Sequence, residues 1–323
     1  MEPLSPEAID DLRHGRATRE RKMAVCGATA HLEPADRAEI LAVLSADGDE
    51  AVASRAQGAL LFQTTESFVE ALKREQAVHA LFAYAAKHLA EKPGITDAMA
   101  QSPSCPPDFI VPLVRHLSTN GVQSLLENLL RLSESPALCA ALDHSTSITM
   151  EQRNLLRELH GPSTPQDEAA LAEAVAAAGL DPEKRLSLLQ EIAKMNVAAR
   201  VQFAVRGGTE ARRTLIRDVS RVVQRAVLQS PKLSDQEVEG FASMSTLTDE
   251  ILRLIANNRN FRKNYSVIRN LLSNAKTPLD VSLHLLPSLN KQDLKRLTMN
   301  KNVPEVLRTS AMKLQRTRTE QRN

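Results

Sequence analysis

The residues in this sequence with the most reactive side chains are a thiol and an imidazole that lie close together in the chain. Cys139 and His144 have types that bind zinc, but no second Cys/His pair stands near enough in sequence to complete four ligands. The other cysteines, Cys26 and Cys105, are far apart. We interpret all three as reduced thiols in helical cores, since an odd, scattered set makes no disulfide framework.

Signatures of catalysis do not occur in the sequence. The eight histidines are scattered, and the patterns HExxH, GxSxG and GxxxxGK[S/T] are missing. We therefore expect no enzyme activity, no metal, no cofactor and no small-molecule substrate.

A glycine pair in the segment 206–213 (RGGTEARR) precedes a predicted helix. Its backbone N–H groups could meet a phosphate, with Arg212 or Arg213 beside them. The preceding strand that nucleotide-binding loops need is missing, however. A helix end followed by a turn accounts for both glycines, and we prefer this interpretation.

The segment 256–265 (ANNRNFRKNY) is unusual in a chain so poor in aromatic residues. It combines four asparagines, three cations and two aromatic rings. As a patch for carboxylates or phosphates it would use Arg259, Arg262, Lys263 and Tyr265. The alternative, which we prefer, is that Asn257 and Asn258 close one helix while Phe261 and Tyr265 dock the next.

Further cations recur at the starts or rims of the helices expected downstream. They are Lys291, Lys295, Arg296, Lys301 and Arg308. In a stacked array they would align into a stripe, the footprint expected for an extended anionic partner.

Charge is divided unevenly along the chain, although the net charge is only +2. Residues 1–190 carry 17 Lys/Arg against 27 Asp/Glu, whereas residues 191–323 carry 24 against 12. Such a division indicates an anionic partner for the basic end, or else two ordinary solvated surfaces.

The elements that must position these residues are expected to be short helices. Aromatic residues make up 3% of the chain and Trp is missing, which disfavours a sheet-rich fold. Helix starts, with a capping residue or a proline before an acidic first turn, recur at 233–237, 247–250, 276–280 and 302–305. The apolar residues between Leu215 and Val227 also keep helical spacing. Helices this short are marginal alone, so they must be stabilised by stacking on neighbours.

Internal repeats support this arrangement. The segment 105–118 aligns without gaps on 277–290, with Pro106 on Pro278 and Asp108 on Asp280. A second pair is 147–159 on 302–314.

The C-terminal third resembles the leucine-rich repeat variant and HEAT-like α-solenoid families of bacteria. The phrases that carry the resemblance are Asn274–Val281 (NAKTPLDV) and Asn300–Arg308 (NKNVPEVLR). Coverage is good from about 197 to 314, with fainter echoes from 95 to 159. The resemblance implies an all-α, curved stack of short helical repeats that holds another macromolecule. The iron–sulfur cluster of some variant-repeat proteins is not carried over, because the chain has no cysteine cluster.

The expected organisation is two helical repeat arrays joined by a linker. We place the arrays at 1–160 and 169–314, the Gly/Pro linker at 161–168, and a basic, disordered tail at 315–323. No apolar run reaches the ~18 residues of a membrane span, and the first residues do not form a signal peptide, so we expect a cytoplasmic protein.

These observations favour a non-catalytic scaffold that binds a protein partner through an extended surface, acidic in its N-terminal half and basic in its C-terminal half. The alternative is nucleic-acid binding by the basic half. The scarcity of aromatic residues disfavours single strands, so contact with a duplex backbone would be expected.

Overall fold

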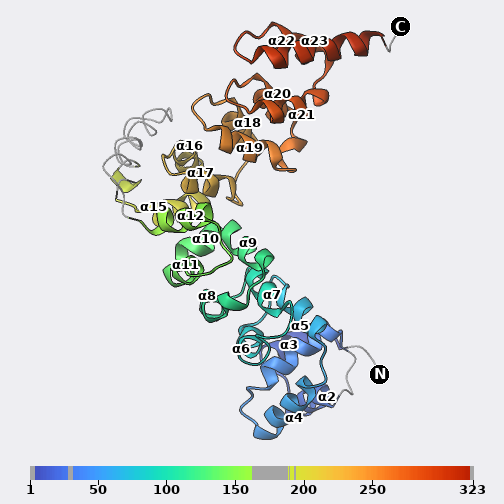
Figure 1. Ribbon diagram of the computed structural model, residues 1–323. Helices are drawn as coiled ribbons and strands as arrows, with labels where there is room; N and C mark the ends of the chain where they lie inside the picture. Colours follow the sequence, from blue (N-terminus) through green and yellow to red (C-terminus); the bar gives the residue numbers. More distant parts are fainter. Residues whose placement is uncertain (1–3, 28–31, 162–187, 189, 193, 321–323) are drawn as a thin grey trace. The chain divides into compact units, whose positions relative to one another are not determined.

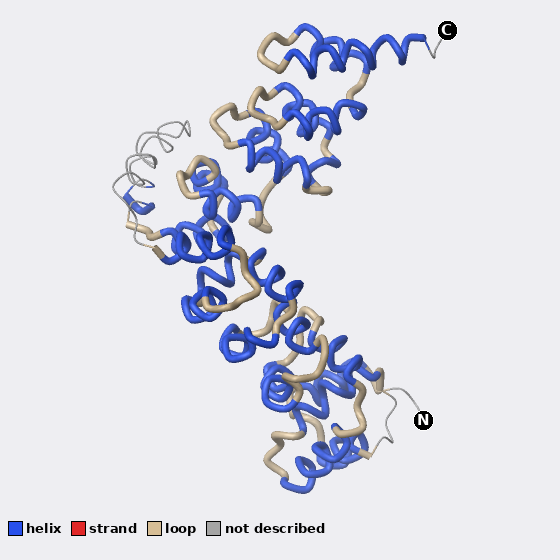
Figure 2. Tube along the Cα trace, viewed as in Figure 1, coloured by secondary structure: helices blue, strands red, loops and turns tan. Residues whose placement is uncertain are grey.

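The computed structural model describes residues 4–27, 32–161, 188, 190–192 and 194–320. Every element in these ranges is a helix, a turn or a loop, so the described chain is all-helical (Figures 1 and 2). It divides into two compact units, 1–157 and 158–323. In the described ranges, no helix is both long and apolar enough to cross a membrane.

The first unit is a succession of short helices connected by brief turns. They are α1 Pro6–Arg13, α2 Arg19–Cys26, α3 Pro34–Leu44, α4 Glu50–Leu60, α5 Thr65–Leu72, α6 His79–His88, α7 Ile95–Gln101, α8 Pro107–Ile110, η1 Val111–His116, α9 Thr119–Glu127, α10 Leu129–Glu134, α11 Pro136–Asp143 and α12 Met150–His160, which extends past the division. Contacts run between near neighbours: α3 packs on α4 and α5, α5 on α7, and α7 on α9.

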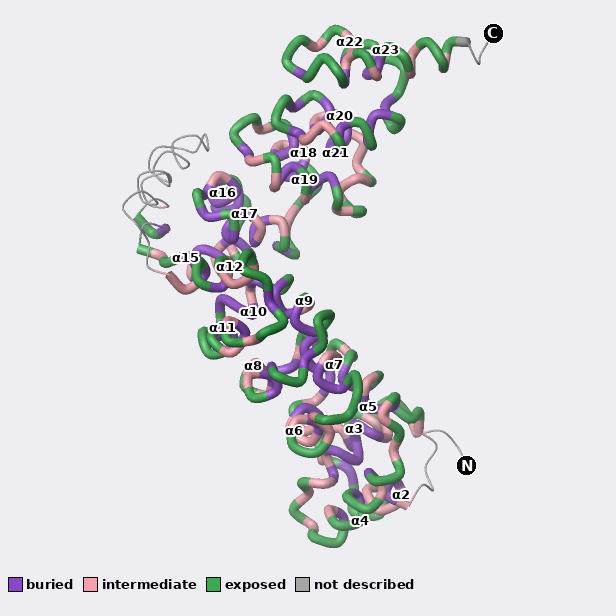
Figure 3. The backbone as a smooth tube through the Cα atoms, viewed as in Figure 1, coloured by how far each residue is buried: buried purple, intermediate pink, exposed green. Residues whose placement is uncertain are grey.

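The second unit follows the same plan. Its helices are α15 Val197–Arg206, α16 Thr209–Leu215, α17 Arg221–Leu228, α18 Asp235–Ser243, α19 Asp249–Asn257, η2 Phe261–Lys263, α20 Tyr265–Ser273, α21 Leu279–Leu285, η3 Leu286–Ser288, α22 Lys291–Met299 and α23 Glu305–Glu320. Here α15 packs on α17, α18 on α20, α20 on α22, and α22 on α23. Within each unit, buried residues gather where neighbouring helices face each other (Figure 3).

Local capping explains where several of these helices begin. The Ser234 hydroxyl accepts the backbone N–H of Glu237, and the Glu237 side chain accepts the Ser234 N–H, so α18 begins with a capping box. Thr248 caps α19 by accepting the N–H of Ile251. Both predicted starts are confirmed.

Long polar side chains tie helices to the carbonyl ends of earlier helices. In the first unit Arg131 donates to the carbonyls of Ala100 and Ser102. In the second, Asn274 donates to Ala242 and Met244, and Arg318 donates to Pro287 and Leu289. In these six contacts the two residues are between 29 and 32 positions apart, and Arg131 also donates to the carbonyl of Cys105, 26 positions away. Because helix-end carbonyls lack partners within their own helix, each tie satisfies groups that would otherwise need water.

The two aligned segments 105–118 and 277–290 adopt the same order of elements. In both, a proline precedes a short α-helix, which passes directly into a 3₁₀ helix containing a second proline, Pro112 or Pro287. A capping residue then begins the next helix: Ser118 before α9 and Asn290 before α22.

Three expectations fare differently. The helical spacing from Leu215 to Val227 is divided between α16 and α17, because Ser220 caps α17, and Val219 in the connection is 50% exposed. The tail expected to be disordered is helical as far as Glu320, and Arg318 donates to the carbonyls of Pro287 and Leu289, which lie just before α22, and so anchors the last turns of α23. The predicted linker lies outside the described residues, apart from Gly161.

Candidate interaction surface

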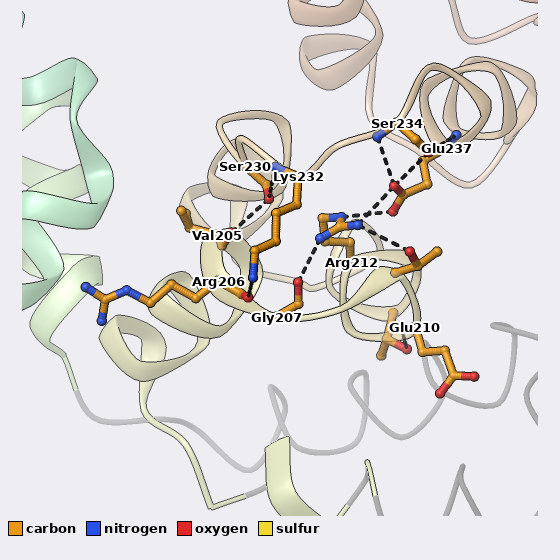
Figure 4. A network of polar contacts seen from close by, with 11 residues as sticks. Val205, Arg206, Gly207, Glu210, Arg212, Ser230, Lys232, Ser234 and Glu237 are labelled. Atoms are coloured by element: carbon orange, nitrogen blue, oxygen red, sulfur yellow. Dashed lines mark hydrogen bonds and ion pairs between the residues drawn. The ribbon is translucent and has the colours of Figure 1, made fainter.

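Gly207, the first glycine of the pair in the second unit, belongs to a network of polar contacts (Figure 4). Gly207 ends α15 and Gly208 precedes α16, as the preferred interpretation predicts. A Cβ atom at Gly207 would lie 2.4 Å from the carbonyl oxygen of Phe203, so the close approach of the backbone requires glycine. Arg212 is not available to a phosphate, because its side chain is only 4% exposed and is fully engaged within the fold.

Arg212 and Glu237 form a bidentate ion pair at the centre of this network. Nε and Nη2 of Arg212 donate to the two Glu237 oxygens at 2.9 and 3.0 Å, and Nη1 donates to Gly207 O at 2.7 Å. Burial acts to raise the pKa of Glu237, but the hydrogen bonds from Arg212 and Ser234 outweigh it, so this pKa lies below its usual range. The network joins α16 to α18 and is structural (Figure 4).

The three thiols lie in the helical cores. All are free and buried. Burial raises the pKa of Cys105 to about 11 and that of Cys139 to about 12, so both remain protonated and weakly reactive at neutral pH. Within the described residues, no group of three or more His, Cys, Asp or Glu side chains is placed to hold a metal ion.

Tyr265, a residue of the candidate patch, has a structural role. Its hydroxyl donates to Asp293 at 2.6 Å and accepts the backbone N–H of Asn290 at 3.1 Å. Burial and the hydrogen bond to the Asp293 carboxylate raise its pKa. Tyr265 therefore fixes the start of α22 against α20, and the docking interpretation holds for this residue.

The cations of the patch lie around η2. Arg259 and Lys263 are exposed, and Lys263 donates to Asn260 at 3.1 Å. Arg262 is half-buried, with its Nε atom covered and without a hydrogen-bond partner. No carboxylate in the described part of the chain forms an ion pair with these three cations.

The cations predicted to form a stripe do not all share one surface. Arg296 lies beside Arg269 of α20 around a pocket of about 220 Å³, and it approaches the Asp293 carboxylate at 3.4 Å. Lys291 and Lys295 lie on α22 against α23 instead. Lys301 is exposed in the connection between α22 and α23, and Arg308 is half-buried in α23.

Two adjoining hollows form a furrow along the α22–α23 pair. Their volumes are about 510 and 230 Å³, and Gln315 and Thr319 line both. We call this the α22–α23 furrow; its lining residues are Lys291, Leu294, Lys295, Thr298, Met299, Met312, Gln315, Arg316, Arg318 and Thr319.

Sequence reasoning missed half of this furrow. Arg316 and Arg318 were assigned to a disordered tail, and no pattern distinguishes the exposed Met299 and Met312 from core methionines. One pattern in the sequence could have indicated that α23 continues into the tail: Met312, Arg316 and Thr319 have i, i+4, i+7 spacing, which places them on one side of a helix.

No protein-family model matches the chain, and neither curated proteins nor solved structures provide a match. The surface is therefore interpreted from the chemistry of its own residues. That chemistry is a concentration of exposed cations around η2, α22 and α23.

Proposed function

We propose that the chain is an α-solenoid of the HEAT-like or leucine-rich repeat variant kind that acts as a non-catalytic scaffold for other proteins. The repeated ties from Arg131, Asn274 and Arg318 support the architecture, because similar sequence separations, here 26 to 32 residues, are expected when similar helix pairs stack one after another. The shared order of elements in 105–118 and 277–290 supports it independently.

One observation carries the functional proposal: most cations in the described part of the C-terminal end have no acidic partner. Residues 251–323 hold 15 Lys/Arg against 4 Asp/Glu. In the described part of this segment, only Arg253 and Arg296 form ion pairs. Cations left unpaired in this number favour an anionic partner.

The same charge supports the alternative, contact with the backbone of duplex nucleic acid. Phosphate contacts would make such binding strongly dependent on salt. Three buried, free cysteines fit a reducing compartment such as the cytoplasm, where either function would operate.

Two measurements test the proposal. In the first, wild-type protein and a Lys291→Glu/Lys295→Glu/Arg296→Glu variant are used to capture binding proteins from the source cells. A matched control, Lys73→Glu/Lys87→Glu/Lys92→Glu, makes the same charge change on exposed lysines of the first unit. We expect that the wild-type protein and the control capture at least one protein that the first variant does not capture.

The second measurement is fluorescence anisotropy with duplex and single-stranded oligonucleotides at about 50 and about 200 mM salt. The scaffold proposal predicts no binding. Duplex binding that weakens steeply with salt would support the alternative, and capture that is equal in all three proteins would contradict a role for the basic surface.

A further inference from the structure

The α22–α23 furrow combines exposed apolar side chains with a cationic rim. Met299 is 64% exposed and Met312 is 43% exposed, and together they provide its apolar surface. Lys295 and Arg316 line the same hollow as the methionines, and Lys291 and Arg318 line the adjoining one. No carboxylate lines either hollow in the described part of the chain.

The furrow faces away from α20. Asp293 accepts the hydrogen bond from Tyr265 and so marks the side of α22 that packs on α20. Lys295, two residues later, points about 200° around the helix, and Lys291 shares its side because it lies four residues earlier. In Figure 1, α20 and α21 accompany the α22–α23 pair on one side only.

Three of the four rim cations are available to a partner. Lys291, Lys295 and Arg316 have no acidic partner in the described residues, whereas Arg318 is held in place by the carbonyls of Pro287 and Leu289. Carboxylates from outside the chain are the complementary charge. The partner must also offer an apolar surface to the methionines, because flexible thioether side chains pack well against apolar groups of varied shape.

We propose that the α22–α23 furrow binds an acidic amphipathic helix of a partner protein, an inference that rests on the scaffold function. The nine residues of α22 extend about 13.5 Å, room for between two and three turns of a partner helix. An apolar stripe would cover Met299 and Met312 while flanking Glu or Asp side chains pair with the rim, as in other helix-in-groove complexes. A phosphate backbone would use the cations but offer nothing apolar to the methionines.

The probe is a synthetic peptide of about 18 residues, long enough to form a helix, with leucines on one face and glutamates on the other. Its binding to the full chain is measured by fluorescence anisotropy. Two control peptides have the same leucine content: one with the leucines scattered around the helix, the other with lysine in place of glutamate. We expect binding of the first peptide alone.

Two furrow variants locate the site. Met299→Gln/Met312→Gln and Lys295→Glu/Arg316→Glu should each weaken binding by about ten-fold or more. The matched controls, Met150→Gln and Lys73→Glu/Lys92→Glu, change exposed residues of the first unit and should leave the affinity unchanged. No binding, or equal binding by the furrow variants, would overturn the inference.

Other occupants give different results. Duplex DNA that binds wild type and the methionine variant equally would assign the rim to nucleic acid. A dimer in sedimentation that the methionine variant loses would assign the furrow to a second copy. Either result overturns the inference.

A photo-crosslinker at position 299 or 259 separates this inference from the scaffold function. A captured protein that crosslinks from 259 alone would leave the scaffold standing and remove the furrow. If no protein is captured and no peptide binds, both proposals fail.

Discussion

At the residue scale, Arg212 and Glu237 form a buried ion pair. Charges taken out of water stay stable only while each compensates the other. Here the Glu237 carboxylate also accepts hydrogen bonds from the hydroxyl and the backbone N–H of Ser234. Arg212, which the sequence suggested as a phosphate ligand, therefore holds α16 against α18 instead.

Replacing Glu237 with Gln should destabilise the protein by about 3–5 kcal/mol at neutral pH, because Arg212 keeps its charge without a compensating one. The pKa of Glu237 is lower in the folded than in the unfolded protein. The charge of Glu237 therefore stabilises the folded wild-type protein at a pH above the unfolded pKa, and this stabilisation is lost as the pH falls through the folded pKa. The gap between wild type and variant should therefore narrow in acid.

Urea unfolding of both proteins at about pH 7 and about pH 3 measures this gap. Asp280→Asn is the control, because its partner Arg253 forms an exposed pair, and it should change stability far less. A gap that stays constant with pH would show that the charge of Glu237 does not stabilise the fold.

A second prediction at this scale tests whether Tyr265 has a structural role or binds a partner. Tyr265→Phe removes the hydroxyl from Asp293 and from the Asn290 N–H, which should cost about 1–3 kcal/mol in unfolding free energy. Binding of any partner at the basic surface should not change, because the hydroxyl is engaged within the fold. The control is Tyr84→Phe, whose hydroxyl makes no hydrogen bond among the described residues. Weakened binding at unchanged stability would return Tyr265 to the partner-binding patch.

At the element scale, the packing of α7 on α9 depends on a missing side chain. A Cβ atom at Gly121 would lie 2.2 Å from Oδ1 of Asp97. Asp97 cannot simply move away, because that oxygen accepts the backbone N–H of Ser118, the residue that caps α9. The two helices approach closely because the glycine leaves room for this carboxylate.

Gly121→Ala should therefore destabilise the first unit by about 1–3 kcal/mol, as overpacking does. Asp97→Ala removes the obstacle and also the cap contact, so the double variant should be more stable than the sum of the single effects predicts. Thermal unfolding of the four proteins gives the coupling. Additive effects would mean that the clash is relieved elsewhere.

Helix starts were the part of the fold that sequence could predict, because a cap acts within a few residues. Ser234 and Thr248 bond to N–H groups three residues ahead, so their function is visible in local sequence. Ser220 was missed because Val219 and its neighbours keep helical spacing through the break. Only the packed fold shows that Val219 is exposed there.

The sequence predicts that the C-terminal surface is basic, but it does not predict which cations lie together on that surface. Lys295 and Arg296 are adjacent in sequence, yet they lie about 100° apart on α22 and line different hollows. The Arg318 anchor depends on carbonyls 29 and 31 residues away, which no local pattern reveals.

At the scale of the whole molecule, interactions between near neighbours prevail in each unit. The Asn274 tie is one example, because its amide donates to the carbonyls of Ala242 and Met244, at and just beyond the end of α18. In the described part of either unit, no strand or central helix gathers the other elements. A chain built in this way stores its stability locally, so damage to one tie should spread only to adjacent helices.

Asn274→Ala should accordingly raise amide hydrogen exchange in α18, α20 and α21 well above that in α15–α17. The expected cost is about 1–3 kcal/mol, since one buried and one partly buried carbonyl lose their donor. Asn300→Ala is a matched control: each asparagine ends a helix and accepts the N–H two residues on, but Asn300 makes no tie to an earlier helix. Mass spectrometry of exchanged peptides gives the comparison. A uniform rise across the second unit would mean that it opens as one cooperative body, which would contradict the proposed stacked-repeat architecture.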